Sequence, residues 1–216
     1  MIRRVFIASI VLGSVVSIGS YPLSGTELPQ AKVLYKIPTK DKVVFVTIDD
    51  GADKPADAAT ELERLQWPIT SFILPTKVGT FTSWFSNLGS RNDIASHTAR
   101  HISLKGLSFE KQKKEICDGE RRIKEKFGST TGYFRPPYGS WDKRTLQAAA
   151  ACGISHVVLW TVSLNGRTIT TWDGKIHPGN IVIAHYVGSL AQSIRELEKR
   201  LKRQGLTVAR LSDYLK

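Results

Sequence analysis

Short apolar runs alternate with amphipathic stretches along most of the chain. The run Val43–Ile48 is β-branched and apolar, which is typical of a strand buried on both faces. The segment Pro55–Gln66 repeats its apolar residues at helical spacing instead. By the same patterns we predict strands at Ile69–Leu74, Asp93–Ala95, Tyr133–Phe134, His156–Trp160, Asn180–Ala184 and Leu206–Ala209, and helices at Phe81–Leu88, Ser108–Phe127, Trp141–Ala151 and Ser189–Arg203, before a short terminal helix.

Repeated strand–helix units predict a parallel sheet with helices outside it. Polar residues follow the carboxyl ends of several predicted strands, namely Asp49, Asp50, His97, Arg135 and His185. In a βα-barrel these ends form one rim, where the chemistry takes place. Full eight-fold barrels typically need about 250 residues, and this chain has 216. We therefore predict a single-domain distorted (β/α) barrel of about seven strand–helix units, with an open doubly wound sheet as the alternative.

The first twenty residues differ in kind from the rest. Arg3 and Arg4 precede the apolar stretch Val5–Ile18, which small residues follow. This pattern predicts a signal peptide over 1–20, then an extended segment over 21–41 and a folded domain over 42–216. The stretch is shorter than the roughly 20 apolar residues that span a bilayer. We expect a secreted or cell-wall-associated protein, with an N-terminal membrane anchor as the alternative because no clear Ala-x-Ala site is present.

The chain is basic, with a formal net charge of +12. Removal of the predicted leader would leave about +10. The densest lysine and arginine cluster, between residues 111 and 126, interleaves with glutamates, which is typical of a solvated helix face. We therefore expect no nucleic-acid partner. Attraction to an anionic cell-wall surface accounts equally well for the charge, and we expect a monomer.

Two cysteines, Cys117 and Cys152, each fall in a predicted helix. In an exported chain an even pair is a disulfide candidate. The alternative is two small buried residues, since neither has the neighbours expected of a nucleophile.

The adjacent acids Asp49 and Asp50 indicate a cation site. Two carboxylates beside an apolar strand are costly to desolvate unless a positive group lies between them. His97 and His101, at positions i and i+4, can converge on one ion, and imidazole with carboxylate suits zinc. One aspartate could bind the ion while its neighbour stays free to act as a base.

Four motifs resemble those of one known family. They are Thr47–Gly51, which reads TIDDG, Ser96–His101, which reads SHTARH, Arg135–Gly139, which reads RPPYG, and Ile183–His185, which reads IAH. Their identity and order are similar to the polysaccharide deacetylase family (carbohydrate esterase family four). The resemblance covers roughly residues 42–212.

The resemblance implies a role for each matching residue. A divalent metal, usually zinc, would be held by Asp50, His97 and His101. The remaining roles that the family implies are general base for Asp49, orientation of that base by Arg135, oxyanion stabilisation by the backbone N–H of Tyr138, and general acid for His185.

One segment departs from the family pattern. The stretch Leu159–Arg167 keeps the opening tryptophan but lacks the acid that in the family supports the general-acid histidine. Asp173, which follows Trp172, is a candidate to replace that acid for His185. Among the tryptophans, Trp141 and Trp172 lie in polar loop contexts and are candidates, with Tyr138, for substrate binding. Core packing is the default for Trp84 and Trp160.

The sequence thus predicts a secreted, metal-dependent hydrolase that removes acetyl groups, N-acetyl rather than O-acetyl, from a glycan such as peptidoglycan or a chitin-like polymer. The altered stretch favours an alternative, a carbohydrate-binding or wall-binding protein on the same scaffold with impaired catalysis. A third hypothesis is a metal amidohydrolase acting on a small non-sugar amide.

Overall fold

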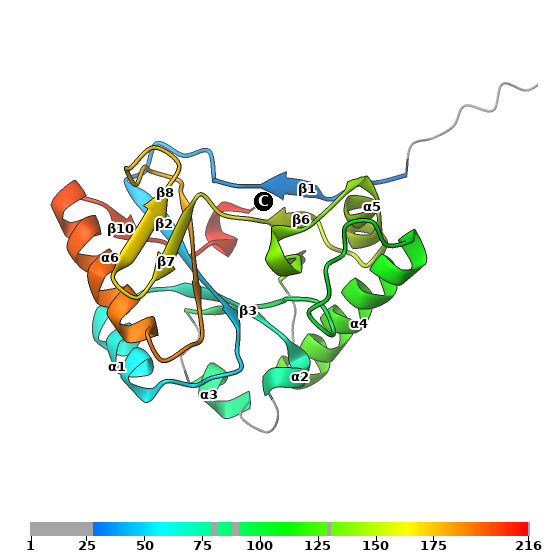
Figure 1. Cartoon of the computed structure of the whole chain (residues 1–216), viewed down its shortest axis with the longest axis horizontal. Helices are drawn as coiled ribbons and strands as arrows, with labels where there is room; N and C mark the ends of the chain where they lie inside the picture. Colours follow the sequence, from blue (N-terminus) through cyan, green and yellow to red (C-terminus); the bar gives the residue numbers. More distant parts are fainter. Residues whose placement is uncertain (1–27, 79–81, 88–90, 129–130, 216) are drawn as a thin grey trace, which may run out of the picture.

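The chain folds around one mixed sheet that is flanked by helices (Figure 1). The computed structural model describes residues 28–78, 82–87, 91–128 and 131–215. The predicted signal peptide, over 1–20, lies outside the described residues. Within the described part of the chain, no helix combines the length and the apolar character needed to cross a membrane.

The strands of the sheet are β1 (Lys32–Leu34), β2 (Val43–Asp50), β3 (Ile69–Ile73), β4 (Asp93–Ser96), β5 (Tyr133–Phe134), β6 (His156–Val158), β7 (Val162–Asn165), β8 (Thr168–Thr171), β9 (Ile181–His185) and β10 (Thr207–Val208). The α-helices are α1 (Ala56–Leu65), α2 (Pro75–Val78), α3 (Thr82–Ser86), α4 (Phe109–Phe127), α5 (Lys143–Ala151) and α6 (Leu190–Gln204), and two 3₁₀ turns are η1 (Pro137–Gly139) and η2 (Ser212–Tyr214).

The sheet has the order β1-β6-β5-β4-β3-β2-β9-β7-β8, and β10 pairs with β2 as well. Neighbouring strands are parallel except β7 and β8, which form an antiparallel hairpin. In the view of Figure 1, α1 and α6 lie on the left of the curved sheet and α4 and α5 on the right. The predicted distorted α/β barrel is confirmed, as an incomplete barrel whose edges are β1 and β8.

Strand β2 is buried on both of its faces, which explains why its sequence is a continuous apolar run. Val44, Val46 and Ile48 belong to the core between the sheet and the flanking helices. Phe45, which points the other way, belongs to a second core on the inner face of the sheet. Side chains alternate between the two faces of a strand, so burial on both faces requires a continuous apolar run.

The ends of the longest helix follow from its sequence. The Ser108 hydroxyl accepts a hydrogen bond from the Lys111 N–H at 3.4 Å and so caps the first turn of α4. Gly128 ends the helix with φ 78°, a left-handed conformation that glycine adopts without steric cost. The predicted span of this helix is confirmed.

The structure adds elements that periodicity did not predict. Part of the predicted extended segment 21–41 is the edge strand β1, and the stretch that departs from the family pattern contains β7 and the turn that leads into β8. Helix α5 begins at Lys143 after the cap Asp142, so Trp141 precedes the helix in which we predicted it. Helix α3 is shorter than the predicted Phe81–Leu88, whose two end residues lie outside the described residues.

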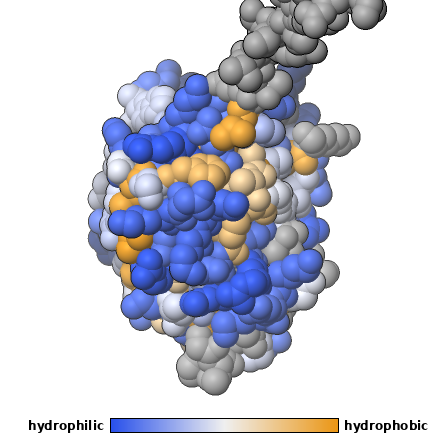
Figure 2. Space-filling model, turned by 90° about the vertical axis from the view of Figure 1, so that its right-hand side faces the viewer, coloured by the Kyte–Doolittle hydropathy of each residue, from blue (hydrophilic) through white to orange (hydrophobic). Residues whose placement is uncertain are grey.

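A disulfide between Cys117 and Cys152 joins α4 to the end of α5, with their Cα atoms 5.1 Å apart. The disulfide candidate is therefore confirmed. The molecular face on the side of these helices is largely hydrophilic, with an apolar strip across its upper part (Figure 2). Ion pairs on that side include Lys114 with Asp118 and Arg121 with Glu125.

We predict that replacing Cys117 and Cys152 together with alanine lowers the free energy of unfolding. The disulfide closes a loop with a sequence separation of 35 residues, and a loop of that length corresponds to about 3–4 kcal/mol in the chain-entropy model. Urea denaturation of the double variant beside the oxidised protein measures the difference. An unchanged denaturation midpoint would contradict the prediction.

Candidate metal centre and active site

The end of strand β2 delivers the two adjacent aspartates to the rim of the barrel. Asp49 is paired in register with Phe72 of β3 on one side and with His185 of β9 on the other. Its side chain is buried, whereas Asp50 is half-buried. Asp50 has φ 79°, so the chain turns sharply there and the two carboxylates separate.

Asp49 forms an ion pair with a completely buried arginine. Nη1 of Arg135 lies 2.6 Å from Asp49 Oδ1 and donates a second bond to the Thr47 hydroxyl at 2.8 Å. The same guanidinium donates through Nε to the carbonyl of Val158 and through Nη2 to that of Leu159, at 3.0 and 3.2 Å. Burial lowers the pKa of Arg135 and the charge of Asp49 opposes that shift. The bonds fix one oxygen of Asp49.

His97 is buried, and its tautomer is set by the main chain. Its Nδ1 lies 2.8 Å from the carbonyl oxygen of Arg135. That oxygen can only accept, so Nδ1 carries the proton and Nε2 presents a lone pair. Burial lowers the pKa of His97, although the charge of Asp49 pulls it the other way. A neutral imidazole with a free Nε2 is the form that binds metal ions.

Three residues form a candidate metal site. One ligand atom from each of Asp50, His97 and His101 lies within 4.8 Å of the others. Nε2 of His101 is 3.4 Å and Nε2 of His97 is 3.7 Å from Asp50 Oδ1. That oxygen is buried and accepts no hydrogen bond from the described residues, which is costly for a carboxylate. The donor set fits zinc, and these three predicted ligands do come together.

Backbone strain is concentrated around this cluster. Among the described non-glycine residues, those with positive φ are Gln66, which ends α1, and four at the site, namely Asp50, Thr98, His101 and Tyr138. Each such residue costs of order 1–3 kcal/mol, so it persists only where its surroundings hold it. The site is thus built on a backbone that the rest of the fold must enforce.

Helix α4 provides that support for the histidine loop. The carboxylate of Glu115, only 2% exposed, accepts bonds from Nε of Arg100 at 2.5 Å and from the Arg100 N–H at 3.2 Å. One turn later, Gly119 packs directly on the loop, and a Cβ there would lie 2.7 Å from the backbone of Thr98.

Glu115 is one of the glutamates in the stretch predicted to be a solvated helix face, and that prediction is wrong for this residue. The buried residues of α4 are Gln112, Glu115, Ile116, Gly119 and Ile123. Their spacing is that of one helical face. The position of Glu115 within this stripe, next to Ile116, was the signal that it is buried.

The aromatic candidates separate into two groups. Tyr138 is 70% exposed, and its ring packs on that of His101 with centroids 4.8 Å apart. Trp172 is exposed and lines a hollow that Tyr138 also lines. Trp141 is not among the residues that line this hollow, whereas half-buried Trp160 is. Trp160 also packs against the core, as expected, and substrate binding by Trp141 stays a prediction.

His185 ends β9 beside Asp49, but its ring is exposed and lines a separate hollow with Ser163 and Asn165. No described carboxylate forms an ion pair with it. Asp173, which we considered as its support, instead lies 2.8 Å from Nε2 of His177. The structure thus brings together Asp49, Asp50, His97, His101 and Arg135, and leaves His185 at the margin.

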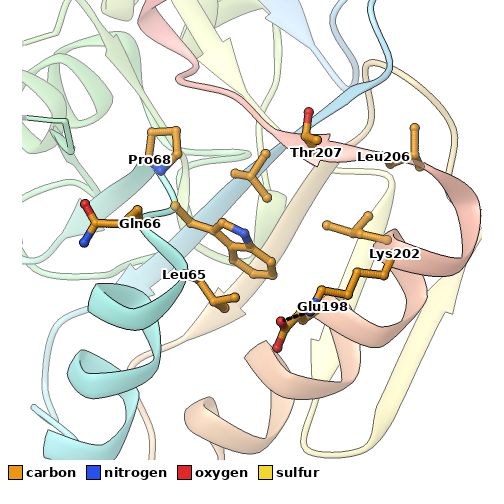
Figure 3. Close-up of a pocket in the computed structure, with 10 residues that line it drawn as sticks. Leu65, Gln66, Pro68, Glu198, Lys202, Leu206 and Thr207 are labelled. Carbon is orange, nitrogen blue, oxygen red and sulfur yellow. Dashed lines mark ion pairs between the residues drawn. The ribbon is translucent and has the colours of Figure 1, made fainter.

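A hollow of about 330 Å³ lies at the opposite end of the barrel, between the last turns of α1 and α6 (Figure 3). It is lined by residues such as Leu65, Pro68 and Leu206, and Glu198 forms an ion pair with Lys202 at its edge. None of the metal-site residues lies there.

The fold and the site define a class of protein, an incomplete βα-barrel with a carboxylate–histidine cluster at the carboxyl ends of its strands. A family model described as polysaccharide deacetylase matches residues 36–157, more than half of the chain. The chain belongs to the polysaccharide deacetylase family.

Two relatives match most of the chain. An uncharacterised protein of Streptomyces coelicolor is 35% identical over 199 residues, which cover 88% of this chain and 79% of that protein. A peptidoglycan-N-acetylglucosamine deacetylase of Bacillus cereus is 26% identical over 205 residues, covering 87% of this chain and 95% of the relative.

Solved structures share the fold at lower identity. A peptidoglycan N-acetylglucosamine deacetylase has a TM-score of 0.72 at 22% identity, covering 86% of this chain and 92% of its own. A carbohydrate esterase family four pseudoenzyme from Bacillus anthracis has a TM-score of 0.73 at 21% identity, covering 85% and 69%. The family model and the Streptomyces coelicolor relative confirm the predicted family, and the solved structures that share the fold include a deacetylase and a pseudoenzyme.

We predict that the protein binds one zinc ion and that His101→Ala weakens this binding. Loss of a direct ligand should reduce zinc affinity beyond the roughly 10–100-fold typical of losing an outer-shell partner. Titration calorimetry with Zn²⁺ on the metal-free protein measures the affinity. The matched control is His177→Ala, because that histidine pairs with Asp173 instead. Equal zinc affinity in the two variants would refute the assignment.

We predict that Gly119→Ala weakens zinc binding through the histidine loop. The added methyl would meet Ser96 Oγ at 2.6 Å and Thr98. Overpacking of this kind costs about 1–3 kcal/mol, more than the about 1 kcal/mol that alanine gains in a helix. Zinc titration and thermal unfolding should both show the loss. Gly188→Ala, whose methyl would meet nothing within 4 Å, should show neither, and a normal affinity in Gly119→Ala would disprove the buttressing role.

Proposed function

We propose that this chain is a zinc-dependent deacetylase that hydrolyses the N-acetyl groups of a cell-wall or chitin-like glycan outside the cell. The observation that supports the proposal is that the two adjacent aspartates have different partners. Arg135 compensates the charge of Asp49, whereas a buried oxygen of Asp50 faces the two histidines without a hydrogen bond. One aspartate is thus prepared as a base and the other as a ligand.

The chemistry follows from these roles. Asp50, His97 and His101 would hold a divalent ion, which would supply a Lewis acid and lower the pKa of a water molecule toward neutrality. Asp49 takes the proton of the attacking water through Oδ2, the oxygen that Arg135 does not bind, which lies 3.8 Å from Nε2 of His97.

Two further groups stabilise the charge that develops on the acetyl oxygen and protonate the leaving group. The backbone N–H of Tyr138 stabilises the negative charge that develops on the acetyl oxygen. His185 protonates the leaving nitrogen, so that the amine departs and the acetyl group leaves as acetate. The N-acetyl choice and the glycan class are supported by the Bacillus cereus relative, which is named for peptidoglycan N-acetylglucosamine.

The surroundings of His185 favour a second candidate. Its ring is exposed, no described carboxylate pairs with it, and the β7–β8 hairpin occupies the stretch that departs from the family pattern. One solved protein that shares the fold is described as a pseudoenzyme. A glycan-binding protein with impaired catalysis would keep the metal cluster and lack an effective proton donor.

We predict that the protein releases acetate from peptidoglycan or from N-acetylglucosamine oligomers, and that Asp49→Asn lowers kcat about 10²–10⁴-fold, the usual contribution of a general base. Asparagine keeps an oxygen for Arg135 but removes the basic carboxylate. Acetate is measured on both substrates and on acetylxylan, before and after chelation.

The control for this variant is Asp213→Asn, an exposed residue in η2 at the end of the chain. Because asparagine leaves the buried charge of Arg135 unbalanced, thermal unfolding is measured on the same samples, and His101→Ala serves as a second inactive variant. Full activity in both Asp49→Asn and His101→Ala would refute the assignment of this site as the active site of a deacetylase. Zinc binding with no acetate release from any substrate would favour the binding protein.

A further inference from the structure

An aromatic hollow of about 220 Å³ adjoins the metal cluster. It is lined by Tyr35, Tyr138, Gly139, Leu159, Trp160 and Trp172. Tyr138 connects it to the proposed reaction centre, because the same ring packs on His101. A molecule held in the hollow is therefore a direct neighbour of whatever reacts at the metal site.

The aromatic rings of the hollow are open to solvent. Tyr35 is 39% exposed and Trp172 is 76% exposed. Their ring centroids are 5.9 Å apart and their planes are inclined at 54°, so the two rings do not cover one another. Large aromatic surfaces left exposed side by side typically mark a binding site.

The pair spans the opening of the barrel. Tyr35 directly follows β1 and Trp172 directly follows β8, and these strands are the two ends of the sheet. Figure 1 shows both strands along the upper side of the molecule. Both aromatic residues also lie outside residues 36–157, the part that the family model matches.

The lining indicates the chemistry of the ligand. None of its six residues carries a charged side chain, so the hollow fits a neutral group. Its volume is below the roughly 300–1,000 Å³ of sites for drug-sized ligands, which suits one ring. A polar rim adjoins it, because Trp172 also lines a second hollow with Lys36, Thr161 and Asn180. A pyranose ring, with an apolar C–H face and hydroxyl edges, matches both surfaces.

We propose that Tyr35 and Trp172 form a sugar-binding subsite that holds a neighbouring ring of the glycan whose acetyl group lies at the metal. This inference deepens the proposed function and rests on it for the orientation of the glycan. The subsite makes the protein selective for oligomers over single sugars, since a single ring at the metal gains nothing from the hollow.

The first test measures binding without turnover. β-1,4-linked N-acetylglucosamine oligomers of one to five rings are titrated calorimetrically into zinc-loaded Asp49→Asn protein, with and without Trp172→Ala or Tyr35→Ala. Each change should weaken binding of the pentamer about ten- to thirty-fold, the loss typical of truncating an aromatic anchor, and leave the monosaccharide unaffected. Trp172→Phe should restore most of the affinity. Leu28→Ala removes another exposed apolar side chain, 57% exposed, as the control.

The second test separates the subsite from charge attraction and from catalysis. Pentamer binding should persist in about 0.5 M salt, where screening suppresses the long-range attraction of a basic surface. In the active protein, Trp172→Ala should raise KM for the pentamer with kcat unchanged.

Equal pentamer affinity in the proteins with Trp172 and with Trp172→Ala would refute the proposed subsite, even if the active protein releases acetate. Trp172-dependent binding without acetate release would overturn the proposed hydrolase and leave the subsite intact.

Discussion

The site depends on one buried ion pair, between Arg135 and Asp49. Arg135 is fully buried, and its guanidinium is bonded to the carboxylate, to the Thr47 hydroxyl and to two main-chain carbonyls. A buried charge is tolerated only when it is paired and hydrogen-bonded. The main chain of Arg135 adds two more contacts, from its N–H to the Ser96 carbonyl and from its carbonyl to His97. One residue thus links the ends of β2, β4, β5 and β6.

This arrangement explains how two adjacent carboxylates acquire different properties. Asp49 already has its counter-charge, so its second oxygen is available for a proton. Asp50 turns away through a left-handed backbone and faces the two imidazoles, where its buried oxygen accepts no hydrogen bond from the described residues. The strained backbone at Thr98 and His101 is held by the packing of Glu115 and Gly119 on the histidine loop. The precision of the centre therefore comes from α4 as much as from the motif residues.

The sequence predicts the regular strands and helices, and it predicts the site residues that lie in short motifs. Strand β2, helix α4 and the ligands Asp50, His97 and His101 were predicted, because long apolar runs, caps and short motifs are local signals. The burial of Glu115 and the part of Trp160 in lining the aromatic hollow were not predicted. Each depends on which face of an element packs against a distant segment. The edge strand β1 was missed because pairing with β6, rather than a strong local pattern, makes it a strand.

The incomplete barrel places the metal cluster and the exposed aromatic pair in different regions of the sheet. The candidate metal cluster lies at the end of β2 and on the loop after β4, where neighbouring strands and α4 support it. The aromatic pair lies at the two edges, after β1 and β8, where one side of each strand has no partner within the described sheet. Side chains at such edges can change without disturbing the ion pair of Arg135 and Asp49. His185 lies between these regions, on β9, with the β7–β8 hairpin beside it. Under the two proposals, the edge that carries Trp172 also carries the stretch without the family's acid for His185, so selectivity and proton donation would both depend on the same hairpin.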